Sequence, residues 1–516
     1  MKIRTSIDFL FCCGLFVFWA FFYQYHILFI EQLSFFHYSS FFWKQYSLQP
    51  GGWAVYCGGF FAQFYDNRWV GALLQTLLLA SLLVFSKNIL KKIGVKGGLL
   101  FLWILPALIL AALQFDNKFT PGDSLVFICP FALAALYMKI TNKMIRRLVY
   151  LFAIIPVYLF SGMVATCSLY LFCTIYELLS ANSNCKLFTH LSIIISKTKQ
   201  RFNQKKMSAI CSFITVSALI FCGSYLFTKK YNRLEEQKFG MSIAASQSNW
   251  DNILKISSTV KNPDNHTAYF TNLALSMKGE LPNKMFQYSQ TDENGLFLVR
   301  WEWEEYNLRY GSEFYYRIGI LNEAIRWLFD ANILRAKGMD YHTLTRLATW
   351  NKENGYTQVA EKYFDILEGT LNYRKWAKHQ RQTPNPQTDT KQPIPEEYYI
   401  GGREPLSDLA RHYDFSSQSQ MMLDYLLCCL LLKNDLEKFL NLFNLCFPRT
   451  MNVPRAYQEA LLSIAKMGKI DIRIYPIDQI NELRFRSFND LASKGKMDAL
   501  QERYGDSWWY YSFMKK

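Results

Sequence analysis

Residues 48–71, LQPGGWAVYCGGFFAQFYDNRWVG, decide how the N-terminal half of this chain is interpreted. The segment opens on a Pro-Gly-Gly turn signal and continues as a short apolar run at 53–65. A helix that crosses a bilayer needs about 20 apolar residues, so this run is too short to cross. We interpret 53–65 as a re-entrant or interfacial element that leads into a membrane span, with Asp66 and Arg68 at its end.

Charge separates the chain into two halves. Residues 1–228 contain 19 Lys/Arg and 6 Asp/Glu, a net charge of +13, whereas residues 229–516 have a net charge of only +3. The basic residues of the first half lie between apolar runs, which indicates the positive-inside rule of membrane proteins and excludes a nucleic-acid partner. The cysteines show no CxxC pair or zinc-ligand spacing, and no P-loop, G-x-S-x-G or HExxH motif is present. We therefore expect no cofactor and no metal.

The apolar runs predict a transmembrane helical domain at 1–228 with about seven spans. The basic connections alternate along the chain, which places the N-terminus in the cytoplasm and the C-terminal half on the outer face. Pro106, Pro130 and Pro156 fall within three successive runs and are expected to kink them. Ser161-Gly162 is expected to form a hairpin, although one span over 147–179 stays open. The spans are expected near 9–30, 69–86, 98–115, 123–139, 147–160, 163–179 and 208–227.

The polar half is predicted to be helical throughout. Residues 341–368 are the clearest unit, because Ala360, Phe364 and Leu367 follow a Gly355-Tyr356 turn at helical spacing. This pattern resembles the second half of a tetratricopeptide repeat, and repeats of this kind stack into an α-solenoid. We expect a helical-repeat domain in two parts, 241–380 and 405–516, with a Pro-rich linker at 381–404. An irregular helical bundle is the alternative.

Charged residues of the predicted outer loops form the one candidate site. A pair of carboxylates at a membrane-facing pocket can act as a general base or hold a metal, and an arginine can clamp a phosphate. The catalytic candidates are Asp66, Arg68 and Asp116. This layout is similar to membrane glycosyltransferases that use lipid-phosphate sugar donors. The full set comprises Glu31, Asp66, Arg68, Asp116, Lys118 and Asp123.

Several segments resemble a family of uncharacterised bacterial integral membrane proteins. These segments are the PGGW…FFAQFYDNRWVG stretch, TNLALSMKGEL at 271–281, MFQY at 285–288, the 355–367 unit and YRKWA at 373–377. The resemblance covers nearly the whole length and implies a multi-span N-terminal half with a tetratricopeptide-like C-terminal half. It implies no activity and no catalytic residue.

The leading functional hypothesis is protein interaction or scaffolding at the cell envelope, because solenoids present concave binding surfaces. The expected partners are the lipid bilayer and envelope proteins bound through the repeat domain. The expected location is the inner membrane, with several passes and a periplasmic C-terminal domain. A glycosyltransferase or phosphotransferase that uses a lipid-phosphate donor is the alternative, and a transporter comes third.

Overall fold

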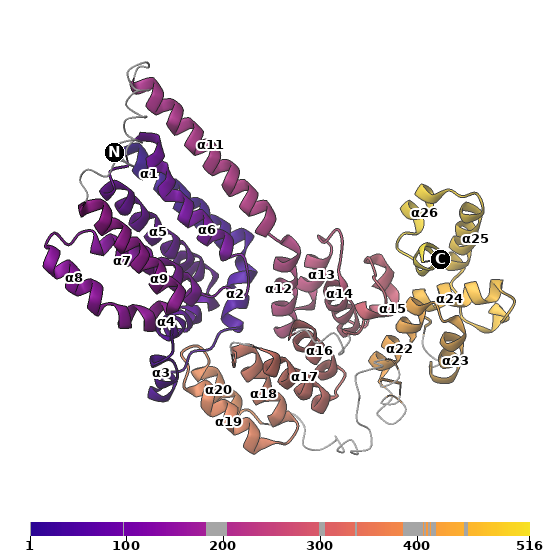
Figure 1. Ribbon diagram of the computed structural model, residues 1–516. Helices are drawn as coiled ribbons and strands as arrows, with labels where there is room; N and C mark the ends of the chain where they lie inside the picture. The colour runs from indigo at the N-terminus through magenta and orange to yellow at the C-terminus, as the bar shows by residue number, and fades with distance from the viewer. Residues whose placement is uncertain are drawn as a thin grey trace. The chain divides into compact units, whose positions relative to one another are not determined.

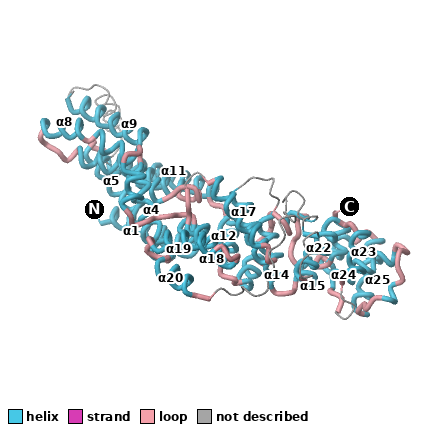
Figure 2. The backbone as a smooth tube through the Cα atoms, turned by 90° about the horizontal axis from the view of Figure 1, so that it is seen from below, coloured by secondary structure: helices cyan, strands magenta, loops and turns pink. Residues whose placement is uncertain are grey.

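Helices account for all regular structure in the part of the chain that is described. The computed structural model describes residues 2–95, 97–181, 204–298, 305–335, 338–384, 406, 409–410, 413, 419–447 and 452–515. Figure 2 shows helices and loops across these ranges, and no strand occurs within them. The predicted all-α class is therefore confirmed.

The chain forms two compact units that do not follow the sequence order. Unit 1 comprises Met1–Arg233, Asp340–His342 and Phe364–Arg381, and unit 2 comprises the remaining residues of Leu234–Lys516. Two segments of the polar half are thus part of the same unit as the apolar half. The boundary predicted at residue 228 does not anticipate this exchange.

Unit 1 contains the apolar helices (Figure 1). Its α-helices are α1 Lys2–Val17, α2 Gln24–Gln32, α3 Ser40–Ser47, α4 Gly52–Ala62, α5 Arg68–Lys92, α6 Leu105–Leu113, α7 Pro121–Tyr137, α8 Lys143–Phe152, α9 Ile154–Ala181, α11 Gln204–Lys230 and α20 Arg374–Gln382, whose last residue falls in unit 2. A π-helix, η1 Phe18–Phe22, and two 3-10 helices, η2 Gln63–Asp66 and η3 Gly97–Ile104, join them.

The prediction of seven spans is wrong for the described residues. Two helices are long and apolar enough to cross a membrane, Arg68–Lys92 and Ile154–Glu177. A third is obtained only if Ile7–Phe22 and Gln24–Gln32, which are bent by 71° at Tyr23, form one span. Part of the predicted span at 208–227 lies outside the residues whose side chains are described.

Helix breaks explain why several apolar runs do not become spans. The run at 98–115 is divided into η3 and α6, and Pro106 lies in the first turn of α6, where proline costs no hydrogen bond. Pro156 also lies in a first turn, that of α9, and only Pro130 lies inside a helix, the 17-residue α7. The prolines therefore begin helices more often than they kink them.

The predicted break at Ser161-Gly162 coincides with a break in α9. Gly162 has φ +76°, a left-handed conformation that glycine adopts without steric cost. Arg146 bonds to Glu177, and the rings of Tyr150 and Tyr170 meet edge to face with centroids 4.6 Å apart, so α8 lies against the second half of α9. Glu177 is thereby a paired carboxylate and not an isolated one.

The segment at 53–65 forms α4 and η2. At about 1.5 Å per residue, the 11-residue α4 is roughly 16 Å long, about half of a bilayer core. It packs closely against the start of α7, because a Cβ on Gly58 would lie 2.2 Å from the backbone nitrogen of Gly122. Both glycines are required by this close approach, which buries one face of α4 against α7, whereas Val55 is exposed; the re-entrant or interfacial role stays a prediction.

Unit 2 is built from short helices around a large apolar core. They are α12 Arg233–Ser246, α13 Trp250–Ser257, α14 Asn265–Met277, α15 Leu281–Lys284, α16 Glu305–Arg317, α17 Leu321–Leu334, α18 Tyr341–Glu353, α19 Thr357–Glu368, α22 Gln420–Lys433, α23 Leu436–Cys446, α24 Arg455–Lys466, α25 Gln479–Ser493, α26 Met497–Tyr504 and α27 Trp508–Met514, with the first residues of α12 and α18 and the end of α19 in unit 1.

The helices predicted at 341–368 are present as α18 and α19. Ala360, Phe364 and Leu367 are buried as the repeat pattern requires, and Gly355 between the helices has φ +86°. These features are compatible with a repeat, but the stacked solenoid stays a prediction. Most of the predicted linker at 381–404 lies outside the described residues.

Candidate functional site

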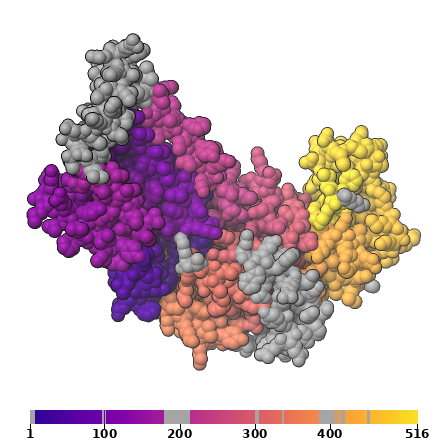
Figure 3. Space-filling model, in the orientation of Figure 1, coloured from indigo at the N-terminus to yellow at the C-terminus, as the bar shows by residue number. Residues whose placement is uncertain are grey.

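The clearest polar site of unit 1 joins the first loop of the apolar half to a segment of the polar half. We call it the clasp, and Figure 3 shows the two segments side by side, indigo against orange. One side of the clasp is formed by residues 31–38 with Gln63, and the other by Tyr341 with residues 369–373.

Backbone hydrogen bonds hold the clasp together. The Tyr38 N–H donates to the Gly369 carbonyl at 3.0 Å, and the Tyr341 N–H donates to the Ser34 carbonyl at 3.1 Å. The Tyr341 hydroxyl accepts from the Phe36 N–H at 3.1 Å and donates to the Phe36 carbonyl at 3.2 Å. Residues more than 300 positions away in the sequence thus form hydrogen bonds with the backbone of this loop segment. These bonds fix the path of the loop.

Gly369 is required by this contact. A Cβ at this position would lie 1.8 Å from Nε2 of His37, which is too close for any side chain. The His37 ring has little freedom to move, because Nδ1 bonds to Ser39 Oγ at 2.9 Å and the ring stacks on Phe35. The close approach of residue 369 to the first loop therefore depends on the absence of a side chain.

Glu31 is the buried carboxylate of the clasp, with 3% of its surface exposed. Its Oε2 accepts a hydrogen bond from the Tyr373 hydroxyl at 3.2 Å, while Oε1 has no hydrogen-bond partner among the described atoms. The neighbouring Asn372 side chain donates to the Gln63 carbonyl. No ion pair joins Glu31 to a lysine or arginine that the structure describes. A buried carboxylate with so little compensation is energetically costly, and such sites are often functional.

The two tyrosines of the clasp remain neutral hydrogen-bond donors. Burial raises the pKa of Tyr373 well above its usual value, and the nearby carboxylates of Glu31 and Asp66 raise it further. Burial also raises the pKa of Tyr341. The two rings stack with centroids 4.6 Å apart and an interplanar angle of 27°. The site thus contains neutral donors, one buried carboxylate and no cation.

The structure brings only part of the predicted constellation together. Asp66 is exposed at the end of η2 and is close enough to act electrostatically on Glu31 and Tyr373. Arg68 bonds to Gln24 and its guanidinium lies 4.8 Å from the centre of the Trp69 ring, so it pairs with none of the predicted carboxylates.

Asp116, Lys118 and Asp123 have local structural roles. The exposed Asp116 accepts from the Lys118 N–H at 2.9 Å in the turn before α7, and Asp123 forms a capping box with Thr120 at the start of that helix. Neither carboxylate is joined to Glu31 or Asp66 by any recorded contact.

Helix α2 separates the two ends of the constellation. His26 bonds to the carbonyl of Gln114, two residues before Asp116, whereas Glu31 faces the clasp. Residues five apart on a helix point about 140° away from each other. Among the described residues there is also no group of three His, Cys, Asp or Glu side chains that would hold a metal ion.

Sequence reasoning included Glu31 but missed its partners. Gly369, Asn372 and Tyr373 carry the contact, yet no motif or periodicity of the sequence relates them to residue 31. Tyr373 does fall within the YRKWA segment, where it precedes two basic residues that are exposed in the structure. This neighbourhood was the only feature of the sequence that drew attention to residue 373.

The fold and the clasp define an all-helical protein that combines candidate membrane spans with a polar helical half. The chain belongs to a family of unknown function, DUF6057, whose match covers residues 1–515. No curated protein and no solved structure matches the chain. The expectation of membership in an uncharacterised family is confirmed.

Proposed function

We propose that this protein is a membrane-anchored interaction protein of the cell envelope. In this proposal the apolar helices of unit 1 anchor the chain in the inner membrane in several passes. The polar half is a tetratricopeptide-like domain on the periplasmic side, and it binds an envelope protein. The clasp supports the anchoring role, because it makes residues 364–381 of the polar half part of the same compact unit as the apolar helices.

One observation carries the interaction role. Helix α25 of unit 2 exposes Ile480 by 72% and Leu483 by 65%, and the preceding 3-10 helix exposes Ile474 by 72%. Residues three apart lie on the same face of a helix, so Ile480 and Leu483 form a continuous apolar strip. Large apolar side chains exposed together on a polar domain are typical of a protein-binding surface. We call these three residues the α25 surface.

The transferase and transporter alternatives have less support. Arg68 bonds to Gln24, Asp116 accepts from Lys118 in the turn before α7, and no hydrogen bond or ion pair among the described residues joins Asp66, Arg68 and Asp116 to one another. The apolar cavity of unit 1 is lined by none of them and by none of the three prolines that a transporter pathway would follow.

Site-specific photocrosslinking in the native organism tests the proposal. A photoreactive amino acid replaces Ile480 or Leu483 in the full-length protein. Glu482 is the matched control position, because its side chain is 44% exposed and lies about 160° from Ile480 and about 100° from Leu483 around α25. We expect one protein adduct of the same mass from both apolar positions, no adduct from position 482, and loss of the adduct when Ile474→Asp is added.

Two results would overturn the proposal. Adducts to lipid alone would make the α25 surface a membrane contact, and equal labelling at all three positions would make it an ordinary exposed surface. Accumulation of each variant in the membrane fraction, measured by immunoblot, confirms that the protein is present in every comparison.

A further inference from the structure

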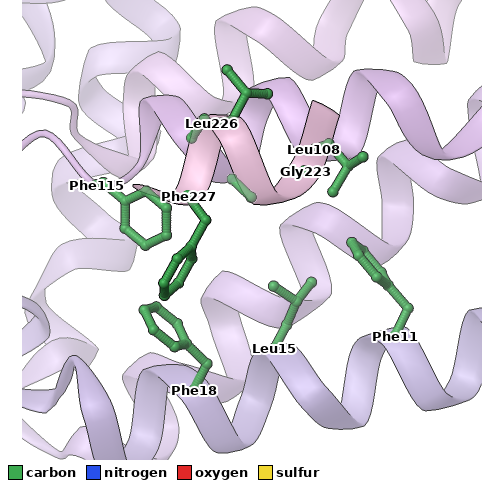
Figure 4. Close-up of a pocket in the computed structure, with 10 residues that line it drawn as sticks. Phe11, Leu15, Phe18, Leu108, Phe115, Gly223, Leu226 and Phe227 are labelled. Atoms are coloured by element: carbon green, nitrogen blue, oxygen red, sulfur yellow. The ribbon is translucent and has the colours of Figure 1, made fainter. Parts of the chain in front are cut away.

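An apolar cleft lies between three helices of unit 1. It has a volume of about 230 Å³, and Figure 4 shows α1 along one side and α11 along the other, with their side chains pointing toward each other. Its lining consists of Phe11, Leu15, Phe18, Leu108, Ala111, Ala112, Phe115, Gly223, Leu226 and Phe227.

The lining contains no polar side chain. An apolar cavity does not hold water well, because water needs two to four polar partners, so a ligand with a hydrocarbon chain is the better occupant. Gly223 keeps the cleft open on the α11 side, where a Cβ would only reach ordinary contact, 3.5 Å, with Leu108. The chemistry of the lining thus selects an apolar chain without hydrogen-bonding groups.

Three aromatic rings close one end of the cleft. Phe18, Phe115 and Phe227 form mutual edge-to-face contacts with ring centroids 5.5 to 5.7 Å apart. Tyr231 stacks on Phe227 at 5.0 Å and contacts Tyr23 at 5.6 Å. Tyrosines that follow an apolar segment are typical of the interface between bilayer and water.

Basic residues follow this aromatic end along α11. Gly223, Phe227 and Lys230 recur at helical spacing, so Lys230 continues the face of α11 that lines the cleft. Lys229, Lys230 and Arg233 are exposed, and no ion pair with a described carboxylate is recorded for them. Asp116 and Lys118, which follow Phe115, have opposite charges. Glu235 and Glu236, which follow in α12, are two acidic residues against the three basic residues at 229–233, so a net positive charge remains along this part of the chain.

The outer face of α11 indicates where the occupant comes from. Its large exposed side chains between residues 213 and 225 are apolar or aromatic, which is typical of a helix in contact with lipid. They are Phe213, Ile214, Ile220, Phe221 and Tyr225, with the small polar residues Ser217 and Ser224 exposed between them.

We propose that the cleft binds one acyl chain of an anionic phospholipid from the surrounding bilayer, with the lipid phosphate at Lys230. Lysine near a bilayer surface contributes about 1 kcal/mol to the binding of anionic lipid, which corresponds to about fivefold in affinity. The aromatic rings align the chain, and the basic end of α11 selects the headgroup.

Native mass spectrometry of the full-length protein from nanodiscs tests the site. The nanodiscs contain equal phosphatidylglycerol and phosphatidylcholine. Gly223→Leu fills the cleft, and Gly14→Leu is the matched control, because a Cβ on Gly14 meets no atom within 4 Å. We expect one retained phosphatidylglycerol per chain, a roughly tenfold loss with Gly223→Leu through exclusion of about two methylene groups, and no loss with Gly14→Leu. Lys230→Gln should reduce the preference for phosphatidylglycerol about fivefold.

Equal lipid retention in Gly223→Leu and Gly14→Leu would overturn the proposed chain site, and an unchanged preference in Lys230→Gln would overturn the headgroup assignment. A second measurement needs no variant. Phosphatidylglycerol with a diazirine in its acyl chain should label peptides that contain residues 11–18 and 223–227. Labelling confined to residues 213–221 would show that the lipid contacts only the outer face of α11, which contradicts the proposal.

Discussion

Glu31 in unit 1 and Glu459 in unit 2 are both buried, and each contacts a segment that is distant in the sequence. Glu459 is 1% exposed and pairs with Arg455 at 2.8 Å, while its other oxygen accepts from the Trp508 N–H at 2.6 Å. Trp509 Nε1 also donates to the carbonyl of Glu459. Glu31 has a neutral tyrosine as its partner and one oxygen without a partner among the described atoms.

The two sites differ in how completely hydrogen bonds and ion pairs compensate the burial of each carboxyl group. At Glu459 a cation and a backbone N–H offset part of the loss of hydration, although burial still raises its pKa to about 7. The bonds to Trp508 and Trp509 connect the C-terminal helix α27 to α24. At Glu31 the contact depends on two neutral side chains, Tyr373 and Asn372, together with the backbone bonds of the first loop and the close approach of Gly369. We infer that the C-terminal contact is a stability element, whereas the clasp is a contact of low local stability that opens more readily.

Removal of the Glu459 side chain should have the largest effect on local stability. Glu459→Ala leaves the Trp508 N–H without its acceptor and Arg455 with Asp506 as its remaining carboxylate partner, and we expect the free energy of local opening of α27 to fall by about 3 kcal/mol. Hydrogen exchange of residues 508–514 in the full-length protein measures this change. Glu482→Ala, which removes an exposed pair with Arg486, is the control and should change it by less than about 0.5 kcal/mol. Equal effects of the two variants would contradict the account.

A third buried carboxylate tests whether neutral hydrogen-bond donors alone leave a carboxyl protonated. Asp424 in α22 accepts from the Tyr457 hydroxyl at 2.8 Å and from Gln420 at 3.0 Å, and burial raises its pKa to about 6 from 3.8. The folded state therefore binds the proton more tightly than the unfolded state. Its contribution to the free energy of unfolding is fully present below about pH 3.8 and is lost as the pH rises through about 6.

The expected loss at Asp424 is on the order of 2–3 kcal/mol over that range. Hydrogen exchange of α22, corrected for the intrinsic pH dependence of exchange, should show it between pH 4 and pH 7. Asp424→Asn keeps the acceptor and should flatten the profile. A profile that stays equally steep in this variant would assign the pH dependence to other groups.

The clasp should be sensitive to added volume at Gly369. Gly369→Val places a side chain against His37, and overpacking of this kind costs about 1–3 kcal/mol. We expect exchange of residues 369–377 to rise about 10- to 100-fold. Gly338→Val is the control, since a Cβ at Gly338 meets no atom within 4 Å, although its φ of +79° adds local backbone strain. Unchanged exchange in Gly369→Val would mean that the first loop does not hold this segment.

The smallest effects are expected at the residues that sequence reasoning placed in a catalytic site. Asp66→Asn and Asp116→Asn change exposed side chains, so each should alter the free energy of unfolding by no more than about 0.5 kcal/mol. Thermal unfolding measures this change. The substitutions should also leave the crosslinking at Ile480 unchanged. Loss of the adduct in Asp66→Asn alone would indicate that the outer loop contributes to partner binding.

The sequence predicted what local patterns determine. Helical spacing at 341–368 identified α18 and α19, the glycine at 162 marked the break in α9, and the charge pattern separated an apolar half from a polar one. The number of spans was wrong because apolar content alone does not reveal how Pro106 and Gly97 divide a run between a 3-10 helix and an α-helix.

The clasp was beyond sequence reasoning for a different reason. Glu31 and Tyr373 are 342 residues apart, and a contact at that separation leaves no periodicity. Outer-loop carboxylates were grouped by topology, yet the side chains of Asp116 and Asp123 are used by the turn and cap of α7, where short-range hydrogen bonds are available. Local turn and cap bonds thus determine where two of these four carboxylates point.

The most direct test of the clasp is a double-mutant cycle between Glu31 and Tyr373. Hydrogen exchange of residues 369–377 is compared among the native protein, Glu31→Gln, Tyr373→Phe and the double variant. Tyr356→Phe, which changes an exposed tyrosine between α18 and α19, is the control. We expect Tyr373→Phe to reduce protection by about 1–2 kcal/mol and the double variant to cost about 1 kcal/mol less than the sum of the single variants. Additive effects within about 0.3 kcal/mol would contradict a direct contact between the first loop and the polar half.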